Sequence, residues 1–290
     1  ITMENVITFP ALGISVTVNR VAFNVFGKDI YWYGVIIALG FALAVLYCSL
    51  RIRRFGFNND LLFDALVAAL PSAIVGARLY YVIWEWGYYS KYPSEIIAVW
   101  HGGMAIYGGI IGALIAVAVY GRVKRASIPG MFDVAALGLL IGQCLGRWGN
   151  FINGEAHGTL TDSVLGMTVN GYGPFHPTFL YESVWTALGF VVLHLVSVYF
   201  YRFRGQIFLS YLVWYGAGRA VIEGLRTDSL YIGQTDIRVS QVVAVVSCIT
   251  GLVLLVLCLR RGVRTLTQLV DPHADPRAIR YPTVKENEDI

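Results

Sequence analysis

The sequence has little charge. Of its 290 residues only 14% are Asp, Glu, Lys or Arg, whereas 57% are hydrophobic and the mean hydropathy is +0.62. Water-soluble domains carry about 25% charged residues, so a water-soluble surface is excluded. The formal net charge is only +4, and nucleic acid is not expected as a partner. The composition therefore indicates a polytopic membrane protein.

Cysteine is also scarce. The four cysteines lie inside apolar stretches, without the paired spacing of a metal site or a legible disulfide framework. We interpret them as small buried hydrophobic residues, and we expect neither a metal nor a cofactor. No internal repeat is visible, which argues against a transporter built from inverted halves.

Long apolar runs predict an all-α membrane fold with seven transmembrane helices. A helix needs about 20 residues to cross a bilayer. The fourth run is short, so that helix is either tilted or continues past Arg147. The predicted spans are approximately 31–50, 61–84, 96–120, 132–145, 179–200, 206–225 and 239–259.

Basic residues predict the orientation. They follow spans one, three, five and seven, at 51–54, 122–125, 202–204 and 260–264. With seven spans these clusters share one side, which the positive-inside rule assigns to the cytoplasm, so the N-terminus is outside and the C-terminus is cytoplasmic. We expect an extracytoplasmic interfacial segment at 1–30. The membrane domain then covers 31–260 with an outward loop at 147–178, and a disordered cytoplasmic tail covers 261–290.

Several charged residues fall inside these spans, where charge is costly and usually functional. Arg78 either extends to the interface or binds a partner. Arg219, Glu223 and Arg226 share one helical face. One interpretation is a neutral Arg219–Glu223 ion pair that makes a polar stripe tolerable in the membrane. The other is a cationic stripe that binds an anion. Glu182 needs a partner, and we expect an arginine from another helix.

The stretch GRWGNFINGEAHG, at 146–158, places polar groups where the membrane should begin. Arginine is well suited to fork onto phosphate oxygens, so arginines at this depth suggest a phospholipid headgroup as ligand. Asparagines could hold glycerol hydroxyls or the loop backbone, and the glycines permit sharp turns and close approach. The outward polar residues are Arg78, Arg147, Asn150, Asn153, Glu155, His157, His176, Arg219, Glu223 and Arg226.

Glycines recur in the third predicted span. Gly108 and Gly112 have the small-xxx-small spacing of closely packed helices. Gly102 and Gly103 lie nearer the outer interface, where they could open the helix around a ligand. Tyr107 follows about one turn deeper, and its hydroxyl needs a partner.

The stretch 146–158 resembles the signature of the bacterial phosphatidylglycerol–prolipoprotein diacylglyceryl transferases. Further motifs follow in the order of that family, so the resemblance covers most of the chain and implies a seven-span helical bundle with its N-terminus outside. These motifs are YWYG at 31–34, GARLYYV at 76–82, GGMAIYGG at 102–109, HPTFLYE at 176–182 and GAGRAVIEGLR at 216–226.

The resemblance also implies a reaction. The diacylglyceryl group of phosphatidylglycerol would pass to the lipobox cysteine of a prolipoprotein, forming a thioether and releasing glycerol phosphate. The implied partners are phosphatidylglycerol, a prolipoprotein signal peptide and membrane lipids. The implied location is the bacterial cell membrane, with the active site toward the outer face.

Site residues follow from the same motifs. The implied catalytic residues are Arg147, Arg219, Tyr107 and Glu223. The implied substrate-binding residues are Tyr33, Arg78, Gly103, Asn150, Asn153, Glu155, Gly158, His176 and Arg226.

Two positions depart from the family pattern. Tyr107 stands where many members carry a histidine that has been considered a base. Since a free phenol ionises far above neutral pH, either an arginine neighbour assists its ionisation or Tyr107 only positions the substrate. Phe179 stands where some members have glutamine.

Two other functions remain open from the sequence. A lipid or anion transporter with an arginine-lined path would place polar groups through the full membrane thickness. A lipid-modifying enzyme could instead use its own cysteine, for which Cys144 is the candidate, about one turn before Arg147.

Overall fold

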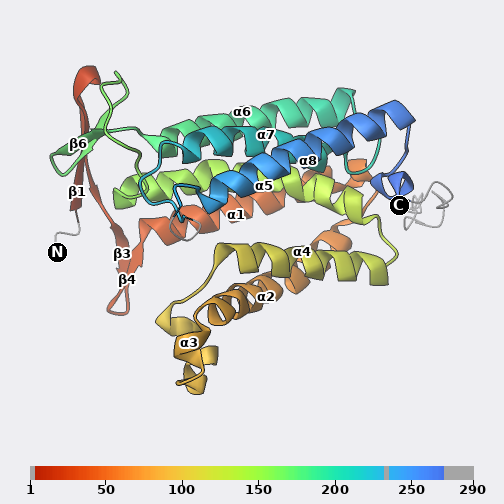
Figure 1. The fold of residues 1–290 in the computed structure, drawn as a ribbon, viewed down its shortest axis with the longest axis horizontal. Coiled ribbons are helices and arrows are strands. Elements are labelled where there is room, and N and C mark those ends of the chain that lie inside the picture. The colour runs from red at the N-terminus through yellow and green to blue at the C-terminus, as the bar shows by residue number, and fades with distance from the viewer. Residues whose placement is uncertain (1–3, 232–234, 271–290) are drawn as a thin grey trace, which may run out of the picture. The chain divides into compact units, whose positions relative to one another are not determined.

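Long helices dominate the fold (Figure 1). The computed structural model describes residues 4–231 and 235–270, so the tail predicted beyond 270 lies outside the described residues. The long helices are α1 (Trp32–Arg51), α2 (Asn59–Trp84), α4 (Ile106–Val123), α5 (Ile128–Asn153), α6 (Thr178–Tyr199), α7 (Gln206–Glu223) and α8 (Val239–Arg261).

Six of these described helices, all except α7, are long and apolar enough to cross a membrane. The chain is therefore a multi-pass membrane protein. Helix α7 falls outside this set because Gln206, Arg219 and Glu223 lower its hydropathy. A seventh span through α7, and the orientation of the termini, stay predictions. The third span was predicted to start at 96, but α4 starts at Ile106, after short 3-10 turns at Pro93–Ile97 and Val99–His101.

The chain divides into two compact units, which are described separately. The first unit contains residues up to Cys48 and those from Asp133 onward, and so includes most of α1 and of α5, and all of α6 to α8. The second unit runs from Ser49 to Phe132 and contains α2, the short helix α3 (Trp86–Tyr89), and α4.

The helices of the first unit pack side by side, with the strands at one end (Figure 1). Helix α7 joins α6 through two tryptophans. The indole nitrogens of Trp185 and Trp214 each donate to the other residue's carbonyl at 2.9 Å, and their rings stack 4.7 Å apart. Helix α1 joins α6 through a 2.7 Å hydrogen bond between Tyr47 Oη and His194 Nδ1. All four of these side chains are half-buried.

A small sheet corrects the all-α prediction. Antiparallel strands pair in the order β2-β1-β5-β6, and a separate hairpin joins β3 to β4. The bounds are β1 (Glu4–Phe9), β2 (Ile14–Asn19), β3 (Val21–Val25), β4 (Lys28–Tyr31), β5 (Met167–Val169) and β6 (Tyr172–Phe175). The alternation of polar and apolar residues within 14–25 favours strands, because successive side chains point to opposite faces.

The sheet is tied to the helices by an apolar core. Ile7, Met167 and Val169 are buried together with Phe179 from the first turn of α6. Strand β1 reaches β5 through the pair Ile7 and Val169. The N-terminal segment therefore belongs to a sheet that covers the start of α6.

The other end of the first unit carries two of the basic clusters. The Arg204 amide donates to the Arg264 carbonyl at 3.2 Å, and the Leu266 amide donates to the Arg204 carbonyl at 3.0 Å. Helix α6 separates this end from the sheet by 22 residues, or about 33 Å.

In the second unit α2 and α4 pack closely through glycines. A Cβ on Gly108 would overlap the Gly76 carbonyl, and a Cβ on Gly112 would overlap the Ser72 carbonyl. The interpretation of Gly108 and Gly112 as helix-packing residues is confirmed, since only small residues permit this approach.

Candidate functional site

Helix α5 continues through half of the polar signature. It ends at Asn153, so the loop predicted at 147–178 begins only at Gly154. The helix persists because its polar and apolar residues separate by face. Arg147, Asn150 and Asn153 follow one another at intervals of three, whereas Phe151 packs on the core of the sheet.

The end of α5 is held by the N-terminal segment. Asn5 Nδ2 donates to the Ile152 carbonyl at 2.9 Å, and Arg20 Nη2 donates to the Asn153 carbonyl at 2.9 Å. These bonds satisfy carbonyls that a helix end leaves without partners. Gly154 turns the chain at φ +65°, where a Cβ would meet Val169 Cγ1 at 2.9 Å. The strands therefore fix where the signature helix stops.

Two buried carboxylates organise the arginines. Glu182 is 3% exposed and Glu223 is 1% exposed. Arg219 bridges them, with Nη1 donating to Glu182 Oε1 at 2.5 Å and Nη2 lying 2.5 Å from Glu223 Oε2. Arg147 Nε contacts Glu182 Oε2, and Arg226 Nη1 lies 3.8 Å from the same oxygen. Arginine partners from α5 and α7 thus confirm the prediction made for Glu182.

Both arginines of the charged stripe at 219–226 are paired with carboxylates. The Arg219–Glu223 pair is present, but Arg219 also spans to α6. Arg226 forks onto Asp228, with Nε donating at 2.9 Å and Nη2 at 2.6 Å. Burial would raise the pKa of Asp228, but the hydrogen bonds and charge of Arg226 outweigh it and hold that pKa below its usual value.

A polar network continues along α5. Arg147 Nη1 donates to Asn150 Oδ1 at 3.4 Å, and Asn150 Nδ2 donates to Glu155 Oε1 at 3.2 Å. Asn153 Nδ2 donates to the same Glu155 oxygen at 3.1 Å. Glu155 therefore fixes both asparagines on the side of the helix that carries Arg147.

Tyr33 lies beside this network. A Cβ on the α5 glycine Gly149 would approach the Tyr33 ring to 2.8 Å at Cδ2. Glycine at this position therefore lets the aromatic ring of α1 lie directly against the signature helix.

Gly158 and His176 connect the loop to the end of α7. The Gly158 amide donates to the His176 carbonyl at 2.9 Å, and the Thr159 amide donates to the Leu225 carbonyl at 2.8 Å. A Cβ on Gly158 would meet His176 Cβ at 2.7 Å and the Leu225 carbonyl oxygen at 2.9 Å. His176 Nδ1 lies 3.3 Å from Tyr181 Oη. Gly158 thus permits the close backbone contact next to Arg226.

Arg78 lies on α2 and binds the backbone of the loop that precedes α4. Its side chain makes five hydrogen bonds of 2.5–3.3 Å to the backbone carbonyls of Glu95, Ile96, Ala98, Gly102 and Gly103. A guanidinium has five N–H donors, so these five bonds match its full donor capacity.

Arg78 thus folds the loop that precedes α4. A Cβ on Gly103 would meet Arg78 Nη1 at 2.6 Å, and Gly103 has φ +73°. Gly102 and Gly103 thus lie in this loop rather than in an opened helix. Tyr107 is half-buried in the first turn of α4. Arg78, Gly103 and Tyr107 all belong to the second unit.

The sequence motifs missed several residues of the first-unit site. Tyr215 lies on α7, where its ring stacks on that of Tyr211 with centroids 5.6 Å apart. Its position four residues before Arg219 was a usable signal, because such residues share a helical face. Asn5 and Arg20 had no local signal, since they reach α5 from more than a hundred residues away.

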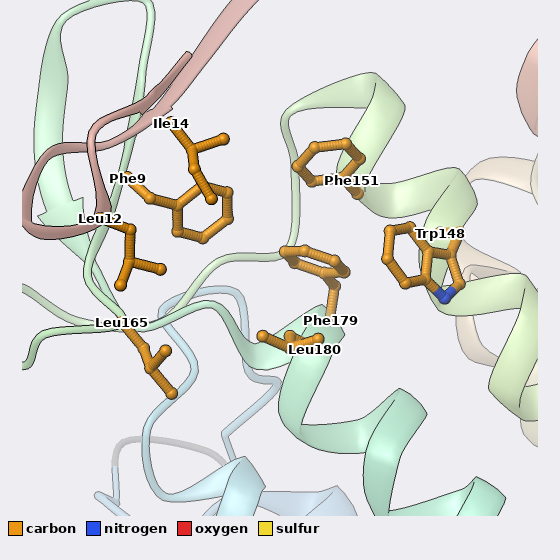
Figure 2. A pocket seen from close by; sticks show the side chains of 8 residues that line it. All are labelled: Phe9, Leu12, Ile14, Trp148, Phe151, Leu165, Phe179 and Leu180. Atoms are coloured by element: carbon orange, nitrogen blue, oxygen red, sulfur yellow. The ribbon is translucent and has the colours of Figure 1, made fainter. Parts of the chain in front are cut away.

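An apolar cavity of about 200 Å³ adjoins the α5 end of the site (Figure 2). Trp148 and Phe179 line it on one side, and Figure 2 shows Phe9, Leu12 and Ile14 of the N-terminal segment on the other. Trp148 is held by a 3.1 Å hydrogen bond from Nε1 to Ser183 Oγ. Because its lining is apolar, this cavity does not suit a phosphate.

The fold and the site define a multi-pass helical membrane protein with buried arginine–carboxylate pairs at the sheet end of one unit. The family described as prolipoprotein diacylglyceryl transferase matches residues 20–257, and the chain belongs to this family.

Curated bacterial relatives agree with this assignment. A Bacillus velezensis protein is 40% identical over 256 residues, covering 84% of this chain and 94% of the relative. A Finegoldia magna protein is 47% identical over 236 residues, covering 81% of this chain and 94% of the relative. Both relatives are named phosphatidylglycerol–prolipoprotein diacylglyceryl transferase.

Proposed function

We propose that this chain transfers the diacylglyceryl group of phosphatidylglycerol to the lipobox cysteine of a prolipoprotein, forming a thioether and releasing glycerol phosphate. The relatives' shared name supports this reaction. The observation that carries the proposal is the arrangement of Arg147, Arg219 and Arg226 around one carboxylate, Glu182. Arginines from different helices that converge in this way suit a single phosphate group.

The reaction is a displacement at carbon. The cysteine thiol gives its proton to water, because the thiolate is the nucleophile. Its sulfur attacks the glycerol carbon that carries the phosphate, so a C–S bond forms as the C–O bond breaks. The bonding electrons leave with glycerol phosphate. Negative charge thus grows on the phosphate, and arginine donors placed there lower the barrier.

Arg147 is the arginine best placed to bind that phosphate. Its Nε contacts Glu182, whereas Nη1 makes only a long 3.4 Å hydrogen bond to Asn150. A phosphate can replace this weak bond at Nη1 and compete with Glu182 for the charge of Arg147. Arg219 already spans two carboxylates through Nη1 and Nη2, so in this proposal it fixes the charges around Arg147.

The remaining residues shape the site. In this proposal Asn150 and Asn153, oriented by Glu155, bind the glycerol hydroxyls, and Tyr33, Gly158 and His176 border the ligand. The family resemblance also implies roles for Gly103 in binding the substrate and for Tyr107 in positioning the thiol or assisting its deprotonation. Arg78 acts indirectly, through the loop that it folds.

We also propose that α7 is the seventh span and that the site faces the outer side of the bacterial cell membrane. The arginine–carboxylate pairs lie at the sheet end of the first unit. The basic residues around Arg204 and Arg264 lie at the other end, which the positive-inside rule assigns to the cytoplasm.

The test is reconstitution. Purified protein in phosphatidylglycerol vesicles should add a diacylglyceryl mass to a lipobox peptide, by a bond that resists hydroxylamine as a thioether does. A peptide with serine in place of cysteine should stay unmodified, and so should the normal peptide in vesicles without phosphatidylglycerol. Loss of the whole diacylglyceryl mass, glyceryl group included, on treatment with neutral hydroxylamine would contradict the proposed reaction.

The same assay tests the alternatives. Cys144 Sγ lies 3.4 Å from Ser183 Oγ, and Cys144→Ser should keep activity. Its inactivity in a folded protein would favour an enzyme that uses its own cysteine. Movement of lipid between leaflets with no peptide product would favour a transporter.

A further inference from the structure

The centre of the site is a carboxylate to which the reaction gives no role. Glu182 lies in the first two turns of α6 and is 3% exposed. It contacts Arg147 of α5 on one side and Arg219 of α7 on the other. Burial of an anion is costly unless cations and hydrogen bonds compensate it. Glu182 therefore exists in this position only because the arginines surround it.

The two oxygens of Glu182 are held differently. Oε1 accepts a short hydrogen bond from Arg219 Nη1 at 2.5 Å. Oε2 touches Arg147 Nε and lies 3.8 Å from Arg226 Nη1. Yet within the described residues Oε2 accepts no well-directed hydrogen bond. The Arg147 contact is therefore a close ion pair without a well-directed hydrogen bond, and a second anion can exchange it more easily than the hydrogen-bonded contact to Arg219.

A phosphate and this carboxylate need the same cations. Charge-assisted bonds from arginine to carboxylate or phosphate are of similar kind and strength. An incoming phosphate must therefore share Arg147 with Glu182, and a departing phosphate returns Arg147 to it. On the basis of the proposed function, we propose that Glu182 is an internal competitor of the substrate phosphate. It positions Arg147 and Arg219 in the empty site and speeds the release of glycerol phosphate.

This role predicts an unusual effect of removing the charge. Without the carboxylate, Arg147 and Arg219 lack their shared counter-charge, so the site should bind a phosphate monoester more tightly. Turnover should fall, because the product leaves slowly and the arginines are less well positioned. A residue that only maintained packing would lower activity without strengthening phosphate binding.

The experiment compares the full-length wild type with Glu182→Gln and Glu182→Asp in detergent. Isothermal titration measures the affinity for glycerol phosphate, and the vesicle assay measures kcat and KM for phosphatidylglycerol. We expect Glu182→Gln to bind glycerol phosphate about tenfold more tightly, since one charge-assisted competitor is lost. Its kcat and KM should both fall. Glu4→Gln, which removes an exposed carboxylate of β1, controls for a change in overall charge.

Glu182→Asp covers the case in which the glutamine variant does not fold. Aspartate keeps the charge, but its shorter side chain cannot reach both arginines. It should therefore bind glycerol phosphate with an affinity between those of the wild type and Glu182→Gln. The proposal is overturned if the folded Glu182→Gln variant binds glycerol phosphate no more tightly than the wild type. If Glu182→Gln does not fold, the same result for Glu182→Asp overturns it.

The binding measurement separates this inference from the proposed reaction. A wild type that makes no thioether product rules out the reaction, and tighter binding in the variants then still supports competition at the arginines. A wild type that makes the product, with variants that do not bind more tightly, rules out the competitor role alone.

Discussion

Arg147 is the single residue on which the proposed chemistry depends most. It contacts Glu182 through Nε and Asn150 through Nη1, and its side chain is 22% exposed. We expect Arg147→Ala to lose transfer completely, because lipid binding and departure of the phosphate both need this cation. Activity is measured in phosphatidylglycerol vesicles, and insertion by membrane fractionation.

Arg122 supplies the matched control for this substitution. It is an exposed residue of the last turn of α4, and Arg122→Ala also removes one positive charge. This variant should keep most of its activity. A fully active Arg147→Ala protein would remove Arg147 from the mechanism.

Asp228 gives a pH dependence at the residue scale. Its pKa is lower in the folded protein than in the unfolded chain, because Arg226 outweighs the effect of burial. The carboxylate therefore contributes stability above its unfolded pKa of about 4. That contribution is lost as the pH falls through the lower folded value. Thermal unfolding at pH 7 and at pH 3 should show a larger loss of Tm for the wild type than for Asp228→Asn. Equal losses would show that the Arg226 fork adds no measurable stability.

At the scale of the element, the end of α5 depends on one glycine. Gly154 has φ +65°, and a Cβ there would crowd Val169 and Asn5. A left-handed conformation costs a non-glycine residue about 1–2 kcal/mol, and crowding adds to this. Gly154→Ala should therefore lower the free energy of unfolding by about 2 kcal/mol and weaken activity through Asn150 and Glu155. Thermal unfolding in detergent measures the change.

Gly142 is the control within the same helix. A Cβ there meets no atom within 4 Å, and alanine favours a helix more than glycine does. Gly142→Ala should therefore be neutral or slightly stabilising. If both alanine variants behaved alike, the turn at Gly154 would not limit the stability of the site.

The same helix illustrates what the sequence could predict. Length and hydropathy are local properties, so they identified the long helices and a short fourth span that is either tilted or continues past Arg147. They did not predict the extension to Asn153, which depends on Asn5 and Arg20 at its end. Strand pairing was missed for the same reason, since Thr8 meets Thr168 across 160 residues of chain.

Side-chain partners were predictable only where chemistry left few choices. A buried Glu182 had to find a cation, and it found arginines on two other helices. A phosphate was only one of the partners open to Arg78, because any loop carbonyl can accept a hydrogen bond from a guanidinium. Its role was therefore decided by the fold of the loop around Gly102, which hydropathy does not report.

At the scale of the whole molecule, the topology depends on α7. By hydropathy alone this helix is not a span, because it carries Arg219 and Glu223. Those charges are neutralised by pairs with each other and with Glu182, so burying them in the bundle costs less than the sequence suggests. We therefore expect α7 to cross the membrane and seven spans to place the two termini on opposite sides.

Three single-cysteine variants test this topology in intact cells. Ser163→Cys lies before α6, Arg202→Cys lies between α6 and α7, and Leu230→Cys lies between α7 and α8. The native cysteines lie within helices and are first replaced by serine. A membrane-impermeant maleimide should label Ser163→Cys and Leu230→Cys from outside, but Arg202→Cys only after permeabilisation. If α7 does not span, Leu230→Cys will behave like Arg202→Cys, because both ends of α7 then lie on one side. That outcome would place the end of α7 that carries Glu223 on the cytoplasmic side, away from outer-leaflet lipid, and the proposed site would lose its access to substrate.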